Sequence, residues 1–300
     1  MSDPVHKVSE PDGDGSPRVV GFYEPDTGSC QYICIDDKTR KAALIDVVQE
    51  FDPAYARTSF DQAEWALRFL EDESLELEWI LDTHPHADHL MASAWLKERT
   101  GAKTAIGAKV REIAEIWRDL YNLPDAFDVD REFDQLFEDG ETFRLGDLDV
   151  EVVLSPGHTL GSITYVIGDA IFAHDTFMQP DAGTARSDFP GGSAKVLYRS
   201  LMRILEFPDT HRIFIGHDYG TDDRDEPAWE STVAEQRENN THIGGGVGED
   251  EYVRLREERD ATLSLPDRML HALQVNLAGG RLPTPESDGH SYFKIPANRL

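Results

Sequence analysis

The sequence predicts an α+β fold in which two mixed β-sheets pack together with helices on the outside. Short apolar runs typical of buried strands come in two batches, over residues 19–107 and 141–216, and stretches with helical spacing interrupt each batch. A hydrophobic fraction of 39% in 300 residues is enough for a large core. Strands and helices mixed in this way bury their apolar faces as layers around a shared core.

The first batch follows a polar, acidic stretch, residues 1–17, which we expect to be flexible. Apolar runs around a turn at residues 24–28 indicate a hairpin within 19–36, and residues 42–48 are typical of a buried strand. The other elements expected here are a helix capped by Ser59, a strand over 77–82, a helix from Leu90, a strand over 103–107 and a helix from Val110.

The second batch predicts more strands and then a mainly helical tail. Its expected elements are strands over 141–145 and 148–154, a hairpin over 164–173, a helix over 194–207, a strand over 212–216 and helical pieces from 229 to 278. We therefore expect a flexible segment (1–17), one large domain (18–222) and a helical extension packed on that domain (223–300).

The charge of the chain excludes some classes of partner. The formal net charge is -29, from 58 acidic and 29 basic residues, which argues against nucleic acid and anionic membranes. The acid is spread along the chain, as in residues 71–73 and 222–226. Our hypothesis is a salt-adapted source, in which a dense acidic surface keeps the protein soluble, and the alternative is an ordinary acidic protein. With no long apolar stretch and no secretion signal at the N-terminus, the expected location is the cytoplasm.

The two cysteines, Cys30 and Cys34, do not predict a disulfide or a metal site. On one strand they would lie about 13 Å apart on the same face. A disulfide needs Cα atoms within about 7 Å. We expect two reduced, packed thiols.

The stretch Thr83-His84-Pro85-His86-Ala87-Asp88-His89 carries the strongest chemical signal. It stands between an expected strand and an expected helix, where three imidazoles and a carboxylate can face one point. Neutral imidazole and carboxylate are common ligands for zinc, iron and manganese. The alternative is a polar surface loop that happens to be rich in histidine.

Three later loops repeat this arrangement, because in each a polar group directly follows an apolar run. They are Ser155-Pro156-Gly157-His158-Thr159, Ala173-His174-Asp175-Thr176 and Ile215-Gly216-His217-Asp218-Tyr219. Side chains at strand ends stand at the rim of a sheet, where loops carry function. Gly157 and Gly216 allow the backbone to turn tightly beside a ligand.

These motifs, in this order, resemble the metallo-β-lactamase superfamily, with its T-H-x-H-x-D-H, G-H-T, later Asp and G-H-D elements. The resemblance runs from Val19 to His217 and implies an αββα sandwich. It also implies two metal sites, the first drawing on His84, His86 and His158, and the second on Asp88, His89 and His217, with Asp175 between them. All seven positions are filled, so two Zn(II) ions are one possible cofactor. His174 is expected to be packed rather than a ligand.

Other stretches resemble the persulfide dioxygenase branch of that superfamily and its bacterial β-lactamase-like hydrolases. These are Gly183–Phe189, Leu197–Leu201, Gly216–Tyr219, Gln274–Pro283 and Tyr292–Asn298. Where that group has a cysteine, this chain has Ser187, so a thiol role is lost there.

This resemblance implies a single Fe(II) held by His84, His158 and Asp175, with open positions for a persulfide and O2. His86, Asp88, His89 and His217 would then orient the ligands. Tyr219 and Asp88 are the candidate catalytic residues. The candidate substrate-binding residues are Arg186, Lys195 and Tyr219.

The expected activity is therefore oxidation of a small persulfide, such as glutathione persulfide, with no nucleic-acid or membrane partner and with a homodimer as a further possibility. The main alternative is a dinuclear zinc thioester hydrolase similar to glyoxalase II, in which a metal-bound hydroxide attacks the carbonyl. A binding protein on an inactive scaffold is disfavoured because no ligand position is missing. A β-lactamase is disfavoured because no export signal is present.

Overall fold

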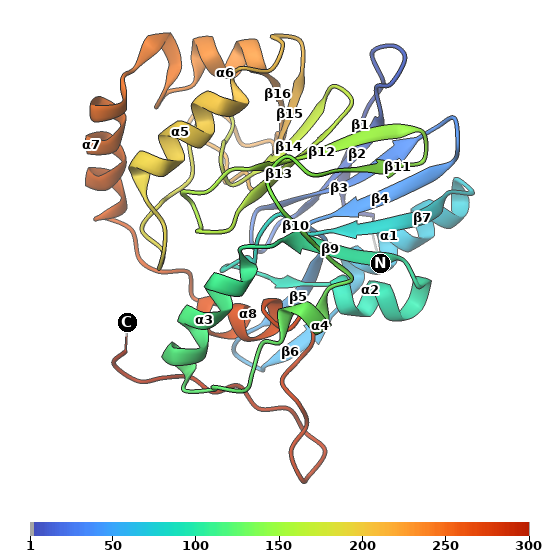
Figure 1. Cartoon of the computed structure of the whole chain (residues 1–300), viewed down its shortest axis with the longest axis vertical. Helices are drawn as coiled ribbons and strands as arrows, with labels where there is room; N and C mark the ends of the chain where they lie inside the picture. The colour runs from blue at the N-terminus through green and yellow to red at the C-terminus, as the bar shows by residue number, and fades with distance from the viewer. Residues whose placement is uncertain (1–2, 300) are drawn as a thin grey trace.

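Two mixed β-sheets face each other in the computed structural model, which describes residues 3–299, and helices cover their outer faces (Figure 1). The sheets share one apolar core. Within it the ring of Tyr32 lies 5.4 Å from the ring of Phe172 and 5.4 Å from that of Phe214, which belong to the opposite sheet. The predicted αββα arrangement is confirmed.

The first sheet has seven strands, antiparallel at one side and parallel at the other. In order across the sheet they are β1 (Val5–Ser9), β2 (Arg18–Glu24), β3 (Ser29–Asp36), β4 (Lys41–Ile45), β7 (Glu76–Leu81), β9 (Lys103–Gly107) and β10 (Gln135–Phe137). Side chains of β3 alternate between the two faces: Cys30, Tyr32 and Cys34 enter the shared core, whereas Ile33 and Ile35 face the outer helices. Both cysteines are free and buried, as predicted.

The second sheet has six strands, with β14 and β15 parallel to each other and the other pairs antiparallel. In order they are β11 (Thr142–Leu145), β12 (Leu148–Leu154), β13 (Ile163–Ile167), β14 (Ala170–His174), β15 (Arg212–Ile215) and β16 (Glu230–Thr232). A small third sheet contains β6 (Arg57–Ser59), β5 (Val48–Asp52) and β8 (Leu90–Met91).

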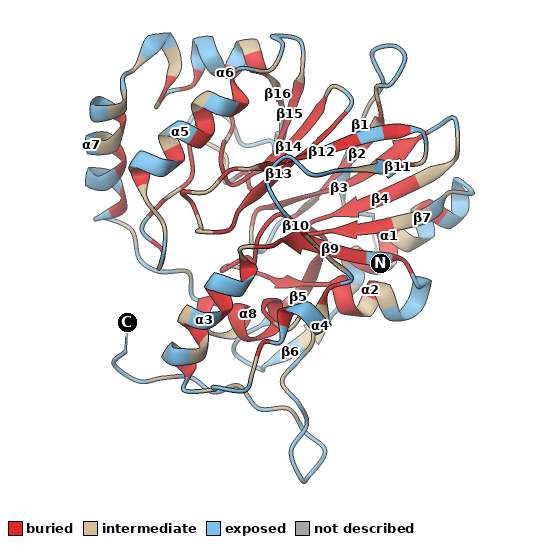
Figure 2. Cartoon of the chain, viewed as in Figure 1, coloured by how far each residue is buried: buried red, intermediate tan, exposed pale blue. Residues whose placement is uncertain are grey.

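Helices cover both outer faces, and Figure 2 shows that their exposed sides lie away from the buried strands. Apolar side chains of α1 (Asp61–Asp72) and α2 (Ser93–Thr100) pack on the first sheet. The second sheet is covered by α5 (Ala194–Ile204), α6 (Val233–Asn239) and α7 (Glu249–Asp260). Apolar side chains of α3 (Val110–Tyr121), α4 (Val129–Glu132) and α8 (Met269–Asn276) pack together in a separate cluster. A short 3₁₀ turn, η1, spans Gly244–Gly246.

The expectation of a flexible lead-in over residues 1–17 is wrong for residues 5–9, which form β1 and pair with β2. Residues 1 and 2 lie outside the described residues. An arginine from the other sheet holds the segment that follows β1: Arg212 donates to Ser9 Oγ, the Pro17 carbonyl and Asp169, at 2.8 to 2.9 Å. The sequence pattern of a short polar segment does not reveal such a distant partner.

Two expected helix starts are also wrong. Ser59 belongs to β6, and the N-terminus of α1 is capped by Glu50, whose carboxylate accepts the N–H groups of Asp61 at 3.0 Å and Gln62 at 2.8 Å. The helix expected from Leu90 begins at Ser93, because Leu90 and Met91 pair with β5 instead.

The extension expected to be helical over 223–300 differs in two places. Residues 230–232 form β16 and complete the second sheet, and residues 281–299 contain no helix or strand. In the described part of the chain, no helix has the length and apolar character needed to cross a lipid bilayer.

Candidate metal centre

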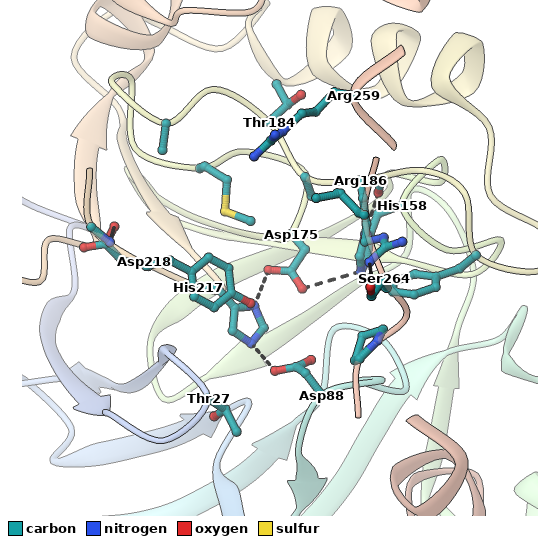
Figure 3. Close-up of a pocket in the computed structure, with 18 of the residues that line it drawn as sticks. Thr27, Asp88, His158, Asp175, Thr184, Arg186, His217, Asp218, Arg259 and Ser264 are labelled. Carbon is teal, nitrogen blue, oxygen red and sulfur yellow. Dashed lines mark hydrogen bonds and ion pairs between the residues drawn. The ribbon is translucent and has the colours of Figure 1, made fainter. Parts of the chain in front are cut away.

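The metal-ligand motifs meet at one rim of the two facing sheets. His84 to His89 follow β7, His158 lies between β12 and β13, Asp175 follows β14, and His217 follows β15. Because β14 and β15 run parallel, their carboxyl ends reach the same edge. Figure 3 shows Asp88, His158, Asp175 and His217 around one pocket. All seven predicted ligands are brought together, in two adjacent groups.

Two glycines allow this close approach, as predicted. A Cβ on Gly216 would stand 2.4 Å from Asp175 Oδ1, and one on Gly157 would stand 2.3 Å from the backbone nitrogen of Leu197. Gly157 also has φ of 131°, a backbone conformation that L side chains rarely adopt. Both positions require glycine for the loops to meet.

The first group consists of His84, His158 and Asp175, and all three are buried. His84 Nε2 lies 3.6 Å and His158 Nε2 lies 3.5 Å from the same oxygen, Asp175 Oδ2. His84 Nε2 is buried and has no hydrogen-bond partner among the described residues. An orphaned buried nitrogen aimed at a carboxylate fits a metal ligand.

Hydrogen bonds on the far side of each ring fix which nitrogen is free. The Nδ1–H of His158 donates to the carbonyl of Arg186 at 2.8 Å. Thr83 donates its hydroxyl to Asp46 at 2.8 Å and therefore accepts at 3.0 Å from the Nδ1–H of His84. Both histidines are thereby held with Nε2 deprotonated, as a metal ligand must be.

The second group consists of His86, Asp88, His89 and His217. Here the ring of His217 joins two carboxylates, with Nε2 at 2.7 Å from Asp88 Oδ2 and Nδ1 at 2.6 Å from Asp175 Oδ1. His86 Nε2 lies 3.2 Å from Asp46 Oδ1. Both ring nitrogens of His86 and Nε2 of His89 are buried and have no hydrogen-bond partner among the described residues, so this group also offers nitrogens to a metal.

The carboxylates at the centre are held in the ionised form. Burial raises the pKa of Asp175 and Asp88, but the neighbouring histidines, His217 foremost, together outweigh this effect, and both pKa values lie well below the usual range for Asp. Ionised carboxylates are the form that binds metal cations.

The pocket beside the centre has a volume of about 900 Å³ and is lined by Asp88, His158, Asp175 and His217, among others. Of the residues predicted to contact substrate, Tyr219 lines this pocket, is 67% exposed, and stacks on His217 with 5.8 Å between ring centroids. It is well placed to meet a ligand.

The other two predicted substrate contacts are placed differently. The guanidinium of Arg186 lines the pocket but is engaged by Asp188 at 2.7 Å and by the Ser264 carbonyl at 2.7 Å. Lys195 is not among the lining residues; it pairs with Glu249 at 3.3 Å on an exposed face of α5. The structure thus places Lys195 outside this pocket, beside a partner from α7 that the local sequence does not reveal.

Several supporting residues were not predicted. Asp46 holds Thr83 and contacts His86, and a single Asp within the apolar run 42–48 was the available signal. Ser29 Oγ lies 3.0 Å from His89 Nδ1 and 3.2 Å from His217 Nε2. No local pattern marked this serine.

Two contributions come from the C-terminal helices. Asn276 of α8 donates to the carbonyls of His86 and His89 and accepts from the N–H of Met91, each at 2.8 Å. In α7 Asp260 accepts from the N–H of Ser187 at 2.9 Å, beside the carbonyl of Arg186 that holds His158. The buried His174, by contrast, bonds Ser155 and Thr176, which agrees with its predicted packing role.

Comparison with known proteins agrees with this geometry. The family model described as the metallo-beta-lactamase superfamily matches residues 25–217, more than half of the chain. A beta-lactamase hydrolase-like protein of Xylella fastidiosa (strain Temecula1) is 51% identical over 285 residues, which cover 95% of this chain but only 66% of that protein. Glyoxylase B2 of Dictyostelium discoideum is 43% identical, covering 94% of this chain and 98% of the relative.

The persulfide dioxygenase ETHE1 of human mitochondria is 27% identical, over 93% of this chain and 95% of the relative. The crystal structure of ETHE1 from Myxococcus xanthus aligns with a TM-score of 0.69 at 28% identity, covering 87% of this chain and 98% of that one. Since the family model spans most of the two sheets and includes every predicted ligand, this chain belongs to the metallo-β-lactamase superfamily.

Proposed function

We propose that this protein is a non-haem iron dioxygenase that oxidises a low-molecular-weight persulfide, such as glutathione persulfide, to sulfite and a thiol. The observation that carries the proposal is the convergence of His84 Nε2 and His158 Nε2 on one oxygen of Asp175, at 3.6 and 3.5 Å. Two histidines and one carboxylate are the usual donor set for Fe(II), which then offers open positions to a substrate and to O2.

The contacts of His217 also support a single iron. His217 contacts carboxylates through both ring nitrogens, at 2.7 and 2.6 Å. We assign His86, Asp88, His89 and His217 to orienting the ligands and shaping access to the site. The relatives named persulfide dioxygenase or ETHE1 add support, because they align over nearly all of this chain.

The reaction balances as persulfide, O2 and water giving thiol, sulfite and two protons. The sulfur–sulfur bond breaks, sulfur loses four electrons in total, and O2 accepts those four electrons. In this scheme Tyr219 donates a hydrogen bond to the bound substrate, and Asp88, which lines the same pocket and contacts His217 at 2.7 Å, holds that ring in place.

The test is oxygen uptake by iron-loaded, anaerobically prepared protein that is given glutathione persulfide, with sulfite assayed in parallel. We expect uptake and sulfite to match in amount and both to be lost in His158→Ala. Lys195→Ala is the matched control, because Lys195 lies outside the pocket and is paired with Glu249. Absence of uptake, together with zinc-dependent cleavage of a glutathione thioester, would contradict the proposal.

That second outcome corresponds to the alternative, a dinuclear zinc thioester hydrolase. One specific observation favours it: His86, Asp88, His89 and His217 offer ligand atoms within 4.8 Å of one another, enough for a second metal beside the first group. The relative named glyoxylase B2 is consistent with it. In such an enzyme two Zn(II) ions would supply a hydroxide at neutral pH.

A further inference from the structure

Two arginines that line the pocket, Arg259 and Arg268, have no carboxylate partner among the described residues, but Arg268 donates to the carbonyl of Asp26 at 3.4 Å. Arg259 of α7 lines the pocket and is exposed, and its guanidinium forms no hydrogen bond or ion pair within residues 3–299. The other two arginines of α7 are engaged: Arg254 pairs with Glu258 at 3.5 Å and Arg256 with Asp260 at 2.7 Å. Figure 3 shows the side chain of Arg259 reaching toward Thr184, at the far end of the pocket from Asp88.

A histidine beside this arginine is prepared to donate a hydrogen bond. His242 lines the same pocket, and its Nδ1 accepts from the N–H of Thr184 at 2.9 Å. Burial, with Arg256 and Arg259 nearby, lowers the pKa of His242 to about 4, so the ring is neutral at pH 7 and its proton resides on Nε2. The hydrogen bonds that His242 makes to described residues through its side chain all involve Nδ1, and none involves Nε2.

The region of the pocket around Arg259 and His242 differs in charge from the rest of the pocket. The guanidiniums of Arg186 and Arg256 are occupied by Asp188 and Asp260, and that of Arg268 donates to the backbone carbonyl of Asp26. Asp26 and Asp267 also line the pocket and would repel an anion from their side of it. In a chain of net charge -29, an unpaired guanidinium next to an imidazole N–H is the place where a small anion is favoured.

We propose that Arg259 and His242 bind a carboxylate of the thiol substrate while its persulfide end reaches the metal centre. The inference rests on the proposed function, because it assigns the substrate to that same site. A guanidinium matches a planar carboxylate with two parallel N–H···O bonds, and the imidazole N–H supplies a third donor. The substrate class is thereby narrowed to persulfides of thiols that carry a free carboxylate.

The test compares binding of glutathione and of glutathione diethyl ester to the iron-loaded protein under anaerobic conditions, by isothermal titration calorimetry. These two probes differ only in their carboxylates. The wild-type protein is expected to prefer the free acid. Arg259→Ala should weaken binding of the acid by about 10- to 100-fold and leave binding of the ester nearly unchanged. Arg259→Lys should lose less, and His242→Phe should reduce the same preference.

Arg254→Ala is the matched control, since Arg254 is on the same helix but outside the pocket, and it should bind both probes as the wild type does. Equal affinity of the wild type for acid and ester, no binding of the acid, or an unchanged preference in Arg259→Ala would overturn the inference.

Oxygen uptake on the same preparations separates the two proposals. If Arg259→Ala oxidises persulfide with the same KM as the wild type, the proposed function stands and the carboxylate site is contradicted. If the wild type takes up no oxygen, but its preference for the acid disappears in Arg259→Ala, the proposed function is contradicted and the carboxylate site stands.

Discussion

Gly216 is a residue at which the size of a side chain directly affects the metal centre. A Cβ at this position would stand 2.4 Å from Asp175 Oδ1, so the backbone between β15 and His217 packs directly on the carboxylate that joins the two ligand groups. Any larger residue must displace Asp175 or the loop, because real Cβ atoms do not approach other atoms so closely.

We therefore expect Gly216→Ala to lose most of its bound metal while it remains folded at lower stability. Gly248→Ala is the control, since a Cβ there meets no atom within 4 Å and its φ is -83°. Metal content after desalting, measured by elemental analysis beside a melting curve, checks the prediction. Wild-type metal content in Gly216→Ala would show that Asp175 tolerates displacement.

At the scale of elements, α8 connects the C-terminal tail to the histidine-rich loop. The side chain of Asn276 is buried and makes three hydrogen bonds of 2.8 Å, to the carbonyls of His86 and His89 and to the N–H of Met91. Without them these backbone groups would be buried and unpaired, which costs about 1–3 kcal/mol for each group.

Asn276→Ala should lower the free energy of unfolding by about 3 kcal/mol and weaken metal retention. Asn276→Asp, which has the same shape but no N–H donor, should do the same. Asn239→Ala, at the exposed end of α6, should change stability by less than about 0.5 kcal/mol. Urea unfolding and metal analysis give both quantities, and full metal retention in Asn276→Asp would exclude a positioning role.

The turn between β13 and β14 forms hydrogen bonds with the N-terminal segment. Asp169, at its turn, accepts from the guanidinium of Arg212 at 2.8 and 2.9 Å and from the hydroxyl of Ser16 at 2.6 Å. Burial raises the pKa of Asp169, but these partners outweigh it and lower the pKa below the usual value. A carboxyl with a lowered folded pKa adds stability above about pH 4, and that contribution is lost as the pH falls through the folded pKa.

Asp169→Asn should therefore destabilise the protein by about 2 kcal/mol at pH 7, with the difference from wild type shrinking below about pH 4. Asp149→Asn removes an exposed partner of Arg144 and should cost less than about 0.5 kcal/mol at any pH. Urea unfolding from pH 7 to pH 3 checks both variants. A difference that persists unchanged at pH 3 would rule out the ion pair as its source.

At the scale of the whole molecule, the charge of -29 is distributed over many exposed segments, such as Glu71 to Glu73 and Asp222 to Glu226. Like charges at this density repel one another in the folded state, and salt screens that repulsion. We expect the melting temperature to rise by at least about 5 °C from low to multimolar KCl. An unchanged or falling melting temperature would favour an ordinary acidic protein over a salt-adapted one.

The layered fold and the ligand loops were predictable because both depend on local patterns. Apolar runs identify the strands, and each ligand directly follows such a run, as His84 follows β7 and His217 follows β15. Parts of the molecule that depend on distant partners were not predictable. Glu50 rather than Ser59 caps α1, Arg212 orders the N-terminal segment, and Glu249 engages Lys195. Each of these contacts joins residues that only the folded chain brings together.

The supporting shell of the metal centre was missed for the same reason. Asn276 reaches the histidine-rich loop across 190 positions of sequence, and Asp260 reaches Ser187 across 73. Arg259 carries no motif, and its unpaired state is visible only after the partners of Arg254 and Arg256 are known. Residue types at strand ends indicate a metal site, whereas the carboxylate site that we propose depends on the packing of α7.

The most direct test of the central claim is the amount of iron bound per chain, measured by elemental analysis after anaerobic loading and desalting. The wild type should retain one iron per chain. His158→Ala should lose the iron, because His158 is one of its three proposed ligands. His89→Ala should keep the iron, because His89 belongs to the second group. Two metals per chain in the wild type, with one of them lost in His89→Ala, would contradict the single-iron account and favour the dinuclear hydrolase.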